Sequence, residues 1–264
     1  MENNKIPVFI VSLAKDTDRR KSIADTLKKE NIYFEFIDAI LGSDLPREEL
    51  DRIKASSPKE FNPTTSEIGC SLSHQKIYSK IINEKIEWAI ILEDDAIINS
   101  SLKHLINGLS EEATIKIREE DLYILGGQDG LSQRRKVSLS FFNKININGI
   151  IFRKLTYKPI YITRTCCYLV SRKLAMNLHE EFNNNYYIAD KWDYLYKKKC
   201  FKNIYLTEII SHPIVDISNS NIEKERLAKL DQEIKKESRK KGSIENGINE
   251  FFFIIKRFLR SLKW

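Results

Sequence analysis

The stretch "IPVFIVSLAKDTDRRKSIADTLKKENIYFEFIDAI" (residues 6–40) decides the fold class of this chain. It begins with a short apolar run over 6–13 that is rich in β-branched residues and typical of a buried strand. The next segment, 16–30, places apolar residues at helical spacing among charged ones, and 32–40 indicates a second strand. Strand, helix and strand in this order form a βαβ unit, which predicts two parallel strands joined by a right-handed crossover.

The same alternation continues along the chain. Thr64 and Glu67 have the spacing of a capping box ahead of a helix that runs to about Asn83, and apolar runs at 88–92 and 121–127 predict further strands. The other predicted elements are a helix over 101–117, a strand that ends at 170 before a helix capped by Ser171, and a late strand within 203–215. Strands that alternate with helices favour an α/β fold with an open sheet flanked by helices.

Two regions lie outside this alternation. Residues 128–160 show few clear periods and many polar residues, so we expect a loop-rich insertion with weak hairpin character. Residues 221–264 are charged and helix-prone. The chain is therefore predicted to have one domain over 1–220, followed by a charged linker and a C-terminal helix over 221–264.

Composition is that of a soluble protein with a core: 264 residues and 30.9 kDa, 42% hydrophobic and 31% charged. The first apolar run is too short for a signal peptide or a membrane span. Four cysteines, Cys70, Cys166, Cys167 and Cys200, lack both CxxC spacing and an accompanying His pattern. They are expected to be reduced thiols in a cytosolic protein, without a zinc site.

The net charge of +7 is concentrated near the C-terminus, because residues 223–264 hold 12 Lys and Arg against 7 Asp and Glu. A nucleic-acid-binding protein more often spreads its cations over a folded face with aromatic residues between them. We therefore expect no nucleic-acid partner.

Three acids, Glu93, Asp94 and Asp95, follow the predicted strand at 88–92 directly. Adjacent carboxylates repel one another and are costly to bury unpaired, so a cation is expected beside them. Open α/β sheets bind ligands at the carboxyl ends of their strands, and carboxylates there suit Mg²⁺ or Mn²⁺ bridged to a diphosphate. The alternative is that these acids cap the next helix or pair with surface lysines.

Five motifs of this sequence resemble, in order and spacing, those of glycosyltransferase family 25, the group of bacterial lipooligosaccharide galactosyltransferases and their collagen galactosyltransferase relatives. These motifs are "FIVSLAKDTDRR" (9–20), "FEFIDAILG" (34–42), "EIGCSLSH" (67–74), "IILEDDAII" (90–98) and "CYLVSRKLAMNL" (167–178). The resemblance covers about residues 6–215. It implies a GT-A-type, Rossmann-like open mixed sheet, a UDP-sugar donor with UDP-galactose favoured, and inverting transfer.

In this resemblance, "EDD" stands where other GT-A enzymes carry the metal-binding DxD motif. Asp95 is then expected to bind Mn²⁺ or Mg²⁺, with Glu93 as the first acid of an ExD variant. His212 follows the last predicted strand and is a further candidate ligand, since many GT-A enzymes supply a late His. Its alternative role is structural.

The resemblance also predicts the donor pocket. The arginines at 19 and 20 suit a diphosphate, or else balance Asp16 and Asp18 at the surface. Asp38 is placed to accept from the uracil ring or a ribose hydroxyl, or to cap a turn, and His74 to line the pocket or to be structural. The predicted donor-binding residues are Ser12, Leu13, Arg19, Arg20, Asp38, His74, Glu93 and Asp94.

Inverting transfer needs a base that deprotonates the acceptor hydroxyl. Asp190 is the candidate, because it lies among aromatic residues suited to stacking on sugar rings, and Asp193 is the fallback. The alternative for Asp190 is an N-cap of a helix that begins near Lys191.

The segment "INEFFFIIKRFLRSLKW" (248–264) has apolar residues at helical spacing with cations on the rim. Its interior charges make it a poor span, so we expect a helix that lies on an anionic membrane surface. This predicts a peripheral protein on the cytoplasmic face of the inner membrane, acting on a lipid-linked oligosaccharide. Alternatively, the segment packs on the domain or mediates oligomers, and a membrane-surface scaffold with an inactive site is the competing function.

Overall fold

An eight-stranded sheet carries the fold of the computed structural model, which describes residues 6–111, 117–129, 131, 134–156, 159–213, 222 and 224–229. The strands are β1 Val8–Ser12, β2 Glu35–Asp38, β3 Trp88–Glu93, β4 Leu122–Gly126, β5 Leu139–Ile147, β6 Ile150–Leu155, β7 Cys167–Ser171 and β8 Ile204–Ile210. Their order across the sheet is β2-β1-β3-β7-β4-β8-β6-β5. Strand β1 pairs in parallel with both β2 and β3, so the predicted βαβ unit is confirmed.

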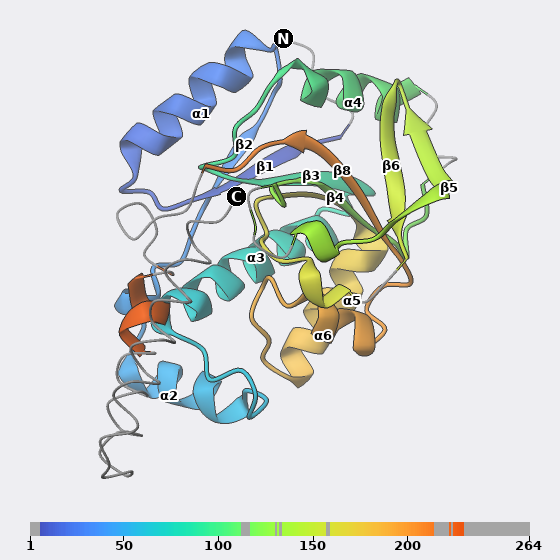
Figure 1. The fold of residues 1–264 in the computed structure, drawn as a ribbon. Coiled ribbons are helices and arrows are strands. Elements are labelled where there is room, and N and C mark those ends of the chain that lie inside the picture. Colours follow the sequence, from blue (N-terminus) through green and yellow to red (C-terminus); the bar gives the residue numbers. More distant parts are fainter. Residues whose placement is uncertain are drawn as a thin grey trace, which may run out of the picture.

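Helices cover both faces of this sheet (Figure 1). One face carries α1 Thr17–Lys29 and α4 Ser100–Glu111, and the other carries α3 Thr65–Asn83, α5 Arg172–Asn184 and α6 Trp192–Lys197. A further helix, α2 Arg47–Ser56, contacts α3. The central strands β1, β3, β4 and β7 are buried from both sides. In β1, Val8 and Ile10 belong to the first core and Phe9 and Val11 to the second, as the period of two requires. The expected open mixed sheet flanked by helices is confirmed.

Local sequence signals explain where the central helices begin. The capping box of α3 is present: the Thr64 hydroxyl accepts from the Glu67 backbone N–H, and the Glu67 carboxylate accepts from that of Thr64. Ser171 caps α5 by accepting from the Leu174 N–H. At Gly69 an added Cβ would lie 2.6 Å from the Ile40 carbonyl oxygen, so only glycine lets α3 approach the chain after β2 this closely.

The hairpin character expected at 128–160 is present and is stronger than predicted, since strands occupy 139–147 and 150–155. Strands β5 and β6 form an antiparallel hairpin, and β6 joins the sheet through β8. Periodicity is weak because β5 is an edge strand that leaves much of its surface in solvent: Phe141 is 72% and Phe142 86% exposed. Without a buried face, a strand has no strict alternation to display.

Strand β7 runs antiparallel to its neighbours β3 and β4. The amino end of β7 therefore lies at the same sheet edge as the carboxyl ends of β3 and β4. One backbone bond shows this, since the Glu93 N–H donates to the Cys166 carbonyl at 2.8 Å. Residues just before β7 are thus placed beside the acids that follow β3.

The predicted membrane helix within 245–264 lies outside the described residues. In the part of the chain that the structure does describe, no helix has both the length and the apolar character needed to cross a bilayer.

A buried acid in β8 predicts a pH-dependent stability. Glu208 has one oxygen 3.1 Å from the Arg134 guanidinium and the other buried without a hydrogen-bond partner among the described residues. Burial, reinforced by the charge of Asp129, raises the pKa of Glu208 to about 7 despite Arg134. The stabilisation that comes with the bound proton is then complete below about pH 4.5 and is lost as the pH rises through about 7.

We expect unfolding free energies of the wild type and of Glu208→Gln, measured in urea from pH 4 to 8.5, to diverge with pH. The wild type should lose up to about 3 kcal/mol relative to the variant over this window, at roughly 1.4 kcal/mol per pKa unit. A difference between the two proteins that does not change with pH would contradict this assignment.

Candidate functional site

The carboxyl ends of β1 and β3 bring together residues from three segments. The Ser12 hydroxyl donates to one oxygen of Asp94 at 2.6 Å, and the Arg19 guanidinium donates to the other at 3.0 Å. Arg19 also lies 3.6 Å from a carboxylate oxygen of Asp95. The side chain of Asp94 is only 9% exposed, so these bonds supply the partners that a buried carboxylate needs. The structure therefore brings together Ser12, Arg19 and Asp94, predicted to bind the donor, and Asp95, predicted to bind a metal.

His212 reaches Asp95 from the end of β8. An isolated bridge between Ile97 and Ser211 holds the chain after β8 against the loop after β3. The His212 Nδ1 lies 2.6 Å from the Pro213 carbonyl oxygen, which accepts a hydrogen bond from it, and Nε2 lies 3.5 Å from Asp95 Oδ1. A neutral imidazole that donates through Nδ1 has its lone pair at Nε2, the state in which histidine binds metals.

The carboxylate of Asp95 has an oxygen that is available to bind a cation. Its Oδ1 is buried and has no hydrogen-bond partner among the described residues. Burial, together with the charge of Glu93, raises the pKa of Asp95 to about 6, against the opposing effect of His212 and Arg19. Asp95, His212 and Cys166 form a group of possible metal ligands in which one ligand atom from each residue lies within 4.8 Å of the others. An unpartnered carboxylate oxygen beside an available imidazole nitrogen fits a divalent transition metal such as Mn²⁺ better than Mg²⁺, which prefers oxygen ligands throughout.

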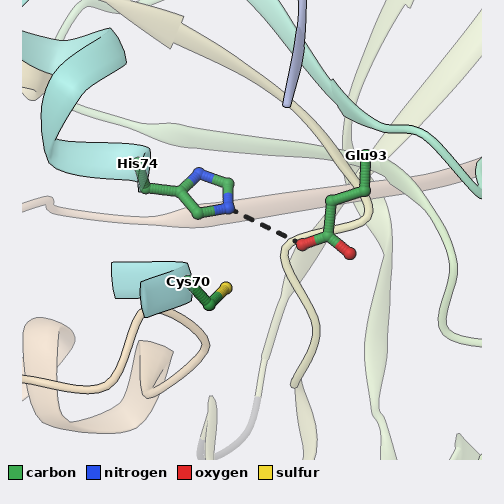
Figure 2. A group of neighbouring side chains, drawn as sticks. All are labelled: Cys70, His74 and Glu93. Atoms are coloured by element: carbon green, nitrogen blue, oxygen red, sulfur yellow. Dashed lines mark ion pairs between the residues drawn. The ribbon is translucent and has the colours of Figure 1, made fainter. Parts of the chain in front are cut away.

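Glu93 turns away from this group and faces α3. The Thr165 hydroxyl donates to its Oε1, and the Nε2 of His74 lies 3.6 Å from the same oxygen (Figure 2). Burial alone would raise the pKa of Glu93, but His74, Thr165 and His212 together lower it. Cys70, one turn before His74 on α3, completes a second group of possible metal ligands with Glu93. The predicted ExD pair is thus divided: Asp95 lies with His212, and Glu93 lies with His74.

The remaining predicted donor residues line the ends of β1 and β2. The Arg20 guanidinium donates to the Ser12 hydroxyl and carbonyl and to Asp38 Oδ1, the last at 2.6 Å. This hydrogen bond, with the charge of Arg20, lowers the pKa of Asp38, whose side chain is 62% exposed. Leu13 contributes its carbonyl, which accepts from the Ser12 hydroxyl and the Asp16 backbone N–H. Arg20 thereby ties β1 to β2 beneath the exposed Asp38 carboxylate.

The two base candidates differ in their surroundings. Asp190 precedes α6 and has a buried Oδ1 without a hydrogen-bond partner among the described residues, and its charge contributes to the raised pKa of Cys70. Asp193 lies within α6, where its carboxylate is 3.4 Å from Lys197. The N-cap of α6 is Lys191 and makes no side-chain capping bond, so the capping alternative for Asp190 is not seen.

A short segment near the C-terminus reaches Asp190 and the start of α3. The Arg226 guanidinium contacts Glu67 at 2.7 Å and Asp190 at 3.7 Å. Glu225 accepts from both the backbone N–H and the hydroxyl of Ser66 in the first turn of α3. The expected capping role of Glu67 is present, and the same carboxylate also binds this segment.

Sequence reasoning missed the residues immediately before β7. Arg164 adopts a φ of 64°, donates to the Gly127 carbonyl at 2.7 Å, and is close enough to Glu93 and Asp95 for their charges to oppose the lowering of its pKa by burial. Gly127 has a φ of 74°, and a Cβ there would lie 2.9 Å from the Cβ of Cys166. The sequence shows the run "TRTCC" (163–167) leading into this strand but does not show that the strand is antiparallel. The antiparallel direction of β7 is what places the run beside Glu93 and Asp95.

Comparison with known proteins gives relatives along half of the chain. A procollagen galactosyltransferase 1 of Danio rerio is 27% identical over 126 residues, covering 45% of this chain and 21% of that protein. A putative glycosyltransferase of Haemophilus influenzae is 33% identical over 101 residues, covering 37% of this chain and 35% of that protein. An inactive glycosyltransferase 25 family member 3 of Mus musculus is 24% identical over 157 residues, covering 57% of this chain and 26% of that protein. The matched part thus spans about a fifth to a third of these relatives.

Among solved structures, a glycosyltransferase involved in the glycosylation of the major capsid of PBCV-1 covers 81% of this chain and 95% of its own, at 9% identity and a TM-score of 0.40. That likeness is too loose to transfer any detail of the site. The family model described as glycosyltransferase family 25 (LPS biosynthesis protein) matches residues 5–193. This range includes every member of the two groups of possible metal ligands except His212. The resemblance read from the five motifs is confirmed: this chain belongs to glycosyltransferase family 25.

Proposed function

We propose that the protein is an inverting transferase that moves galactose from UDP-galactose to a saccharide acceptor in lipooligosaccharide or lipopolysaccharide biosynthesis. Family 25 membership supports glycosyl transfer, and the family description names LPS biosynthesis. Similarity to a procollagen galactosyltransferase supports galactose as the hexose. The observation that carries the proposal is the buried, unpartnered Oδ1 of Asp95 beside His212 Nε2, with Arg19 on the other side of the carboxylate.

These residues suit the diphosphate of a nucleotide sugar. Asp95 and His212 would hold a divalent cation, for which Mn²⁺ fits best, and when bound that cation offsets the negative charge that develops on the leaving diphosphate. Arg19 adds a fixed positive charge at the same edge, 3.0 Å from Asp94 and 3.6 Å from Asp95. Asp94 is held by Ser12 and Arg19, so its role is to position the loop and the arginine, and it leaves the cation to its neighbour.

Asp190 is the proposed base. It would take the proton of the acceptor hydroxyl while that oxygen forms a bond to the anomeric carbon and the bond from this carbon to the UDP oxygen breaks, with inversion. Its Oδ1 is buried and unpartnered in the described part of the chain, so it can accept that proton without first breaking a bond. Each candidate has a cation beside it, Lys197 at 3.4 Å from Asp193 and Arg226 at 3.7 Å from Oδ2 of Asp190. Asp190 is preferred because its other oxygen, Oδ1, has no hydrogen-bond partner among the described residues.

A catalytically inactive scaffold is the second candidate. The observation that favours it is the similarity to an inactive family member in mouse. A coupled assay of UDP release, run with a panel of UDP-sugars and Mn²⁺, separates the two functions. Release of UDP from UDP-galactose above the level of an enzyme-free control supports the transferase, and its absence with every sugar and acceptor supports the scaffold.

We further propose that residues 245–264, outside the described part of the structure, attach the protein to the cytoplasmic face of the inner membrane. The support is their sequence, which alternates aromatic and aliphatic residues with Lys and Arg at helical spacing. A lipid-linked acceptor is confined to that surface, so attachment would raise its local concentration at the enzyme.

Asp95→Asn is expected to fold like the wild type and to lose roughly a thousandfold in kcat, equivalent to about 4 kcal/mol of leaving-group stabilisation. The amide keeps the shape of the side chain but is a poor ligand for a hard cation. The measurement is UDP release as a function of Mn²⁺ concentration. Wild-type turnover that persists in excess EDTA would contradict the metal assignment.

Asp190→Asn is expected to lower kcat by roughly 10²-fold or more while leaving the KM for UDP-galactose nearly unchanged, because the base contacts the acceptor hydroxyl. Asp193→Asn is the matched control and should retain most of the activity. A larger kcat loss in Asp193→Asn, or a loss of donor binding in Asp190→Asn, would assign the base elsewhere.

Removal of residues 245–264 is expected to release the protein from vesicles that contain anionic lipid while sparing transfer to a soluble acceptor. Co-sedimentation with vesicles, repeated at rising salt, measures the first effect, and UDP release measures the second. The attachment proposal fails if the shortened chain still co-sediments, or if binding of the full chain does not weaken with salt.

A further inference from the structure

We propose that Cys70, His74 and Glu93 form a second cation site, separate from Asp95, that binds a thiophilic divalent metal such as Zn²⁺. Cysteine and histidine are four positions apart on α3, so both side chains lie on one face of that helix. Glu93 ends β3 and meets this face from the sheet. Their ligand atoms lie within 4.8 Å of one another, and Figure 2 shows the thiol and the imidazole turned toward the carboxylate.

An unpartnered buried nitrogen points into this group. His74 is 1% exposed, and its Nε2 has no hydrogen-bond partner among the described residues, lying 3.6 Å from Glu93 Oε1. A buried polar atom left without a partner is costly, so this orientation of the ring calls for an explanation. A cation between the imidazole nitrogen and the carboxylate oxygen would satisfy both.

Hydrogen bonds from surrounding residues hold the imidazole and the carboxylate of this group in place. The Nδ1 of His74 lies 2.7 Å from the Tyr168 hydroxyl, which lies 2.8 Å from the hydroxyl of Tyr78. The contact with Tyr168 fixes the His74 ring so that Nε2 faces Glu93, where the metal would bind. On the opposite side, the Thr165 hydroxyl donates to Glu93 and holds the carboxylate in place.

The donor set determines which metal would bind. One thiolate, one imidazole and one carboxylate match Zn²⁺, which takes sulfur, nitrogen and oxygen ligands and keeps a fourth position for water when the protein supplies three. Binding would release the thiol proton of Cys70 to solvent as the sulfur–metal bond forms, with no change in oxidation state. A harder cation would gain little from the sulfur of Cys70.

The spacing of cysteines in the sequence did not point to this group. Without a CxxC pattern, no zinc site was expected from the sequence. The third ligand comes from β3, and only the packing of α3 on the sheet brings it to the helix. In contrast, the group around Asp95 and His212 has its own cysteine, Cys166, and provides an internal control for thiol binding.

The test uses Co²⁺ as an optical probe for Zn²⁺ on the full chain, freed of metal by chelation. We expect one equivalent of Co²⁺ to produce the near-ultraviolet absorption band of a cobalt–thiolate bond, and Zn²⁺ to abolish it. Cys70→Ser should lose the band, whereas Cys166→Ser and Cys200→Ser should keep it. Circular dichroism of each variant confirms folding.

Two more variants keep the test decisive if Cys70→Ser fails to fold. His74→Gln and Tyr168→Phe retain the thiol and should weaken Zn²⁺ binding at least tenfold, as measured by competition with a chromophoric chelator. Asp95→Asn should leave Zn²⁺ affinity unchanged, so this site and the proposed Mn²⁺ site are tested separately. A band that persists in Cys70→Ser, or that disappears only in Cys166→Ser, would overturn the proposal, as would Zn²⁺ affinity that is unaffected in His74→Gln and Tyr168→Phe.

Discussion

Three consecutive carboxylates can coexist at the end of β3 because each one points toward a different set of partners. Asp94 is held by Ser12 and Arg19, Glu93 meets Thr165 and His74, and Asp95 lies against His212. This separation of charge requires that β1, α1, α3, the chain before β7 and the end of β8 all converge on one sheet edge. The order of strands and the approach of α3 supply these partners, without which acids at this depth would be costly.

The parts of this arrangement that depend on local sequence could be predicted. The βαβ unit, the capping box of Thr64 and Glu67, and the cap at Ser171 follow from spacing alone. So did the position of the acids, because the end of a buried strand in an open α/β sheet is a place where ligands bind. The five motifs placed the chain in its family, and the family model confirms this.

The sequence did not reveal the direction of β7 or which separate segments come close together at the site. The antiparallel course of β7 moves Arg164 and Thr165 to the edge where a wholly parallel sheet would never place them, and no residue preference distinguishes the two directions. The group on α3 joins a helix to a strand end through packing between layers. The β5–β6 hairpin was predicted only as weak hairpin character, because an edge strand with much of its surface in solvent loses the alternation on which strand prediction relies. The first two features depend on contacts between segments remote in sequence, whereas the hairpin joins strands that are neighbours in the chain.

The contact of Glu225 and Arg226 with α3 has a practical consequence for how the protein is handled. Glu225 places a carboxylate at the positive end of the α3 dipole, an effect of about 0.3–1 kcal/mol, and Arg226 supplies a cation to Glu67 and Asp190. A recombinant chain ended at residue 220, where the sheet domain was predicted to stop, would lose both groups. Kinetic work intended to describe the native environment of Asp190 therefore belongs on chains that extend beyond residue 229, and affinity tags are better placed away from that junction.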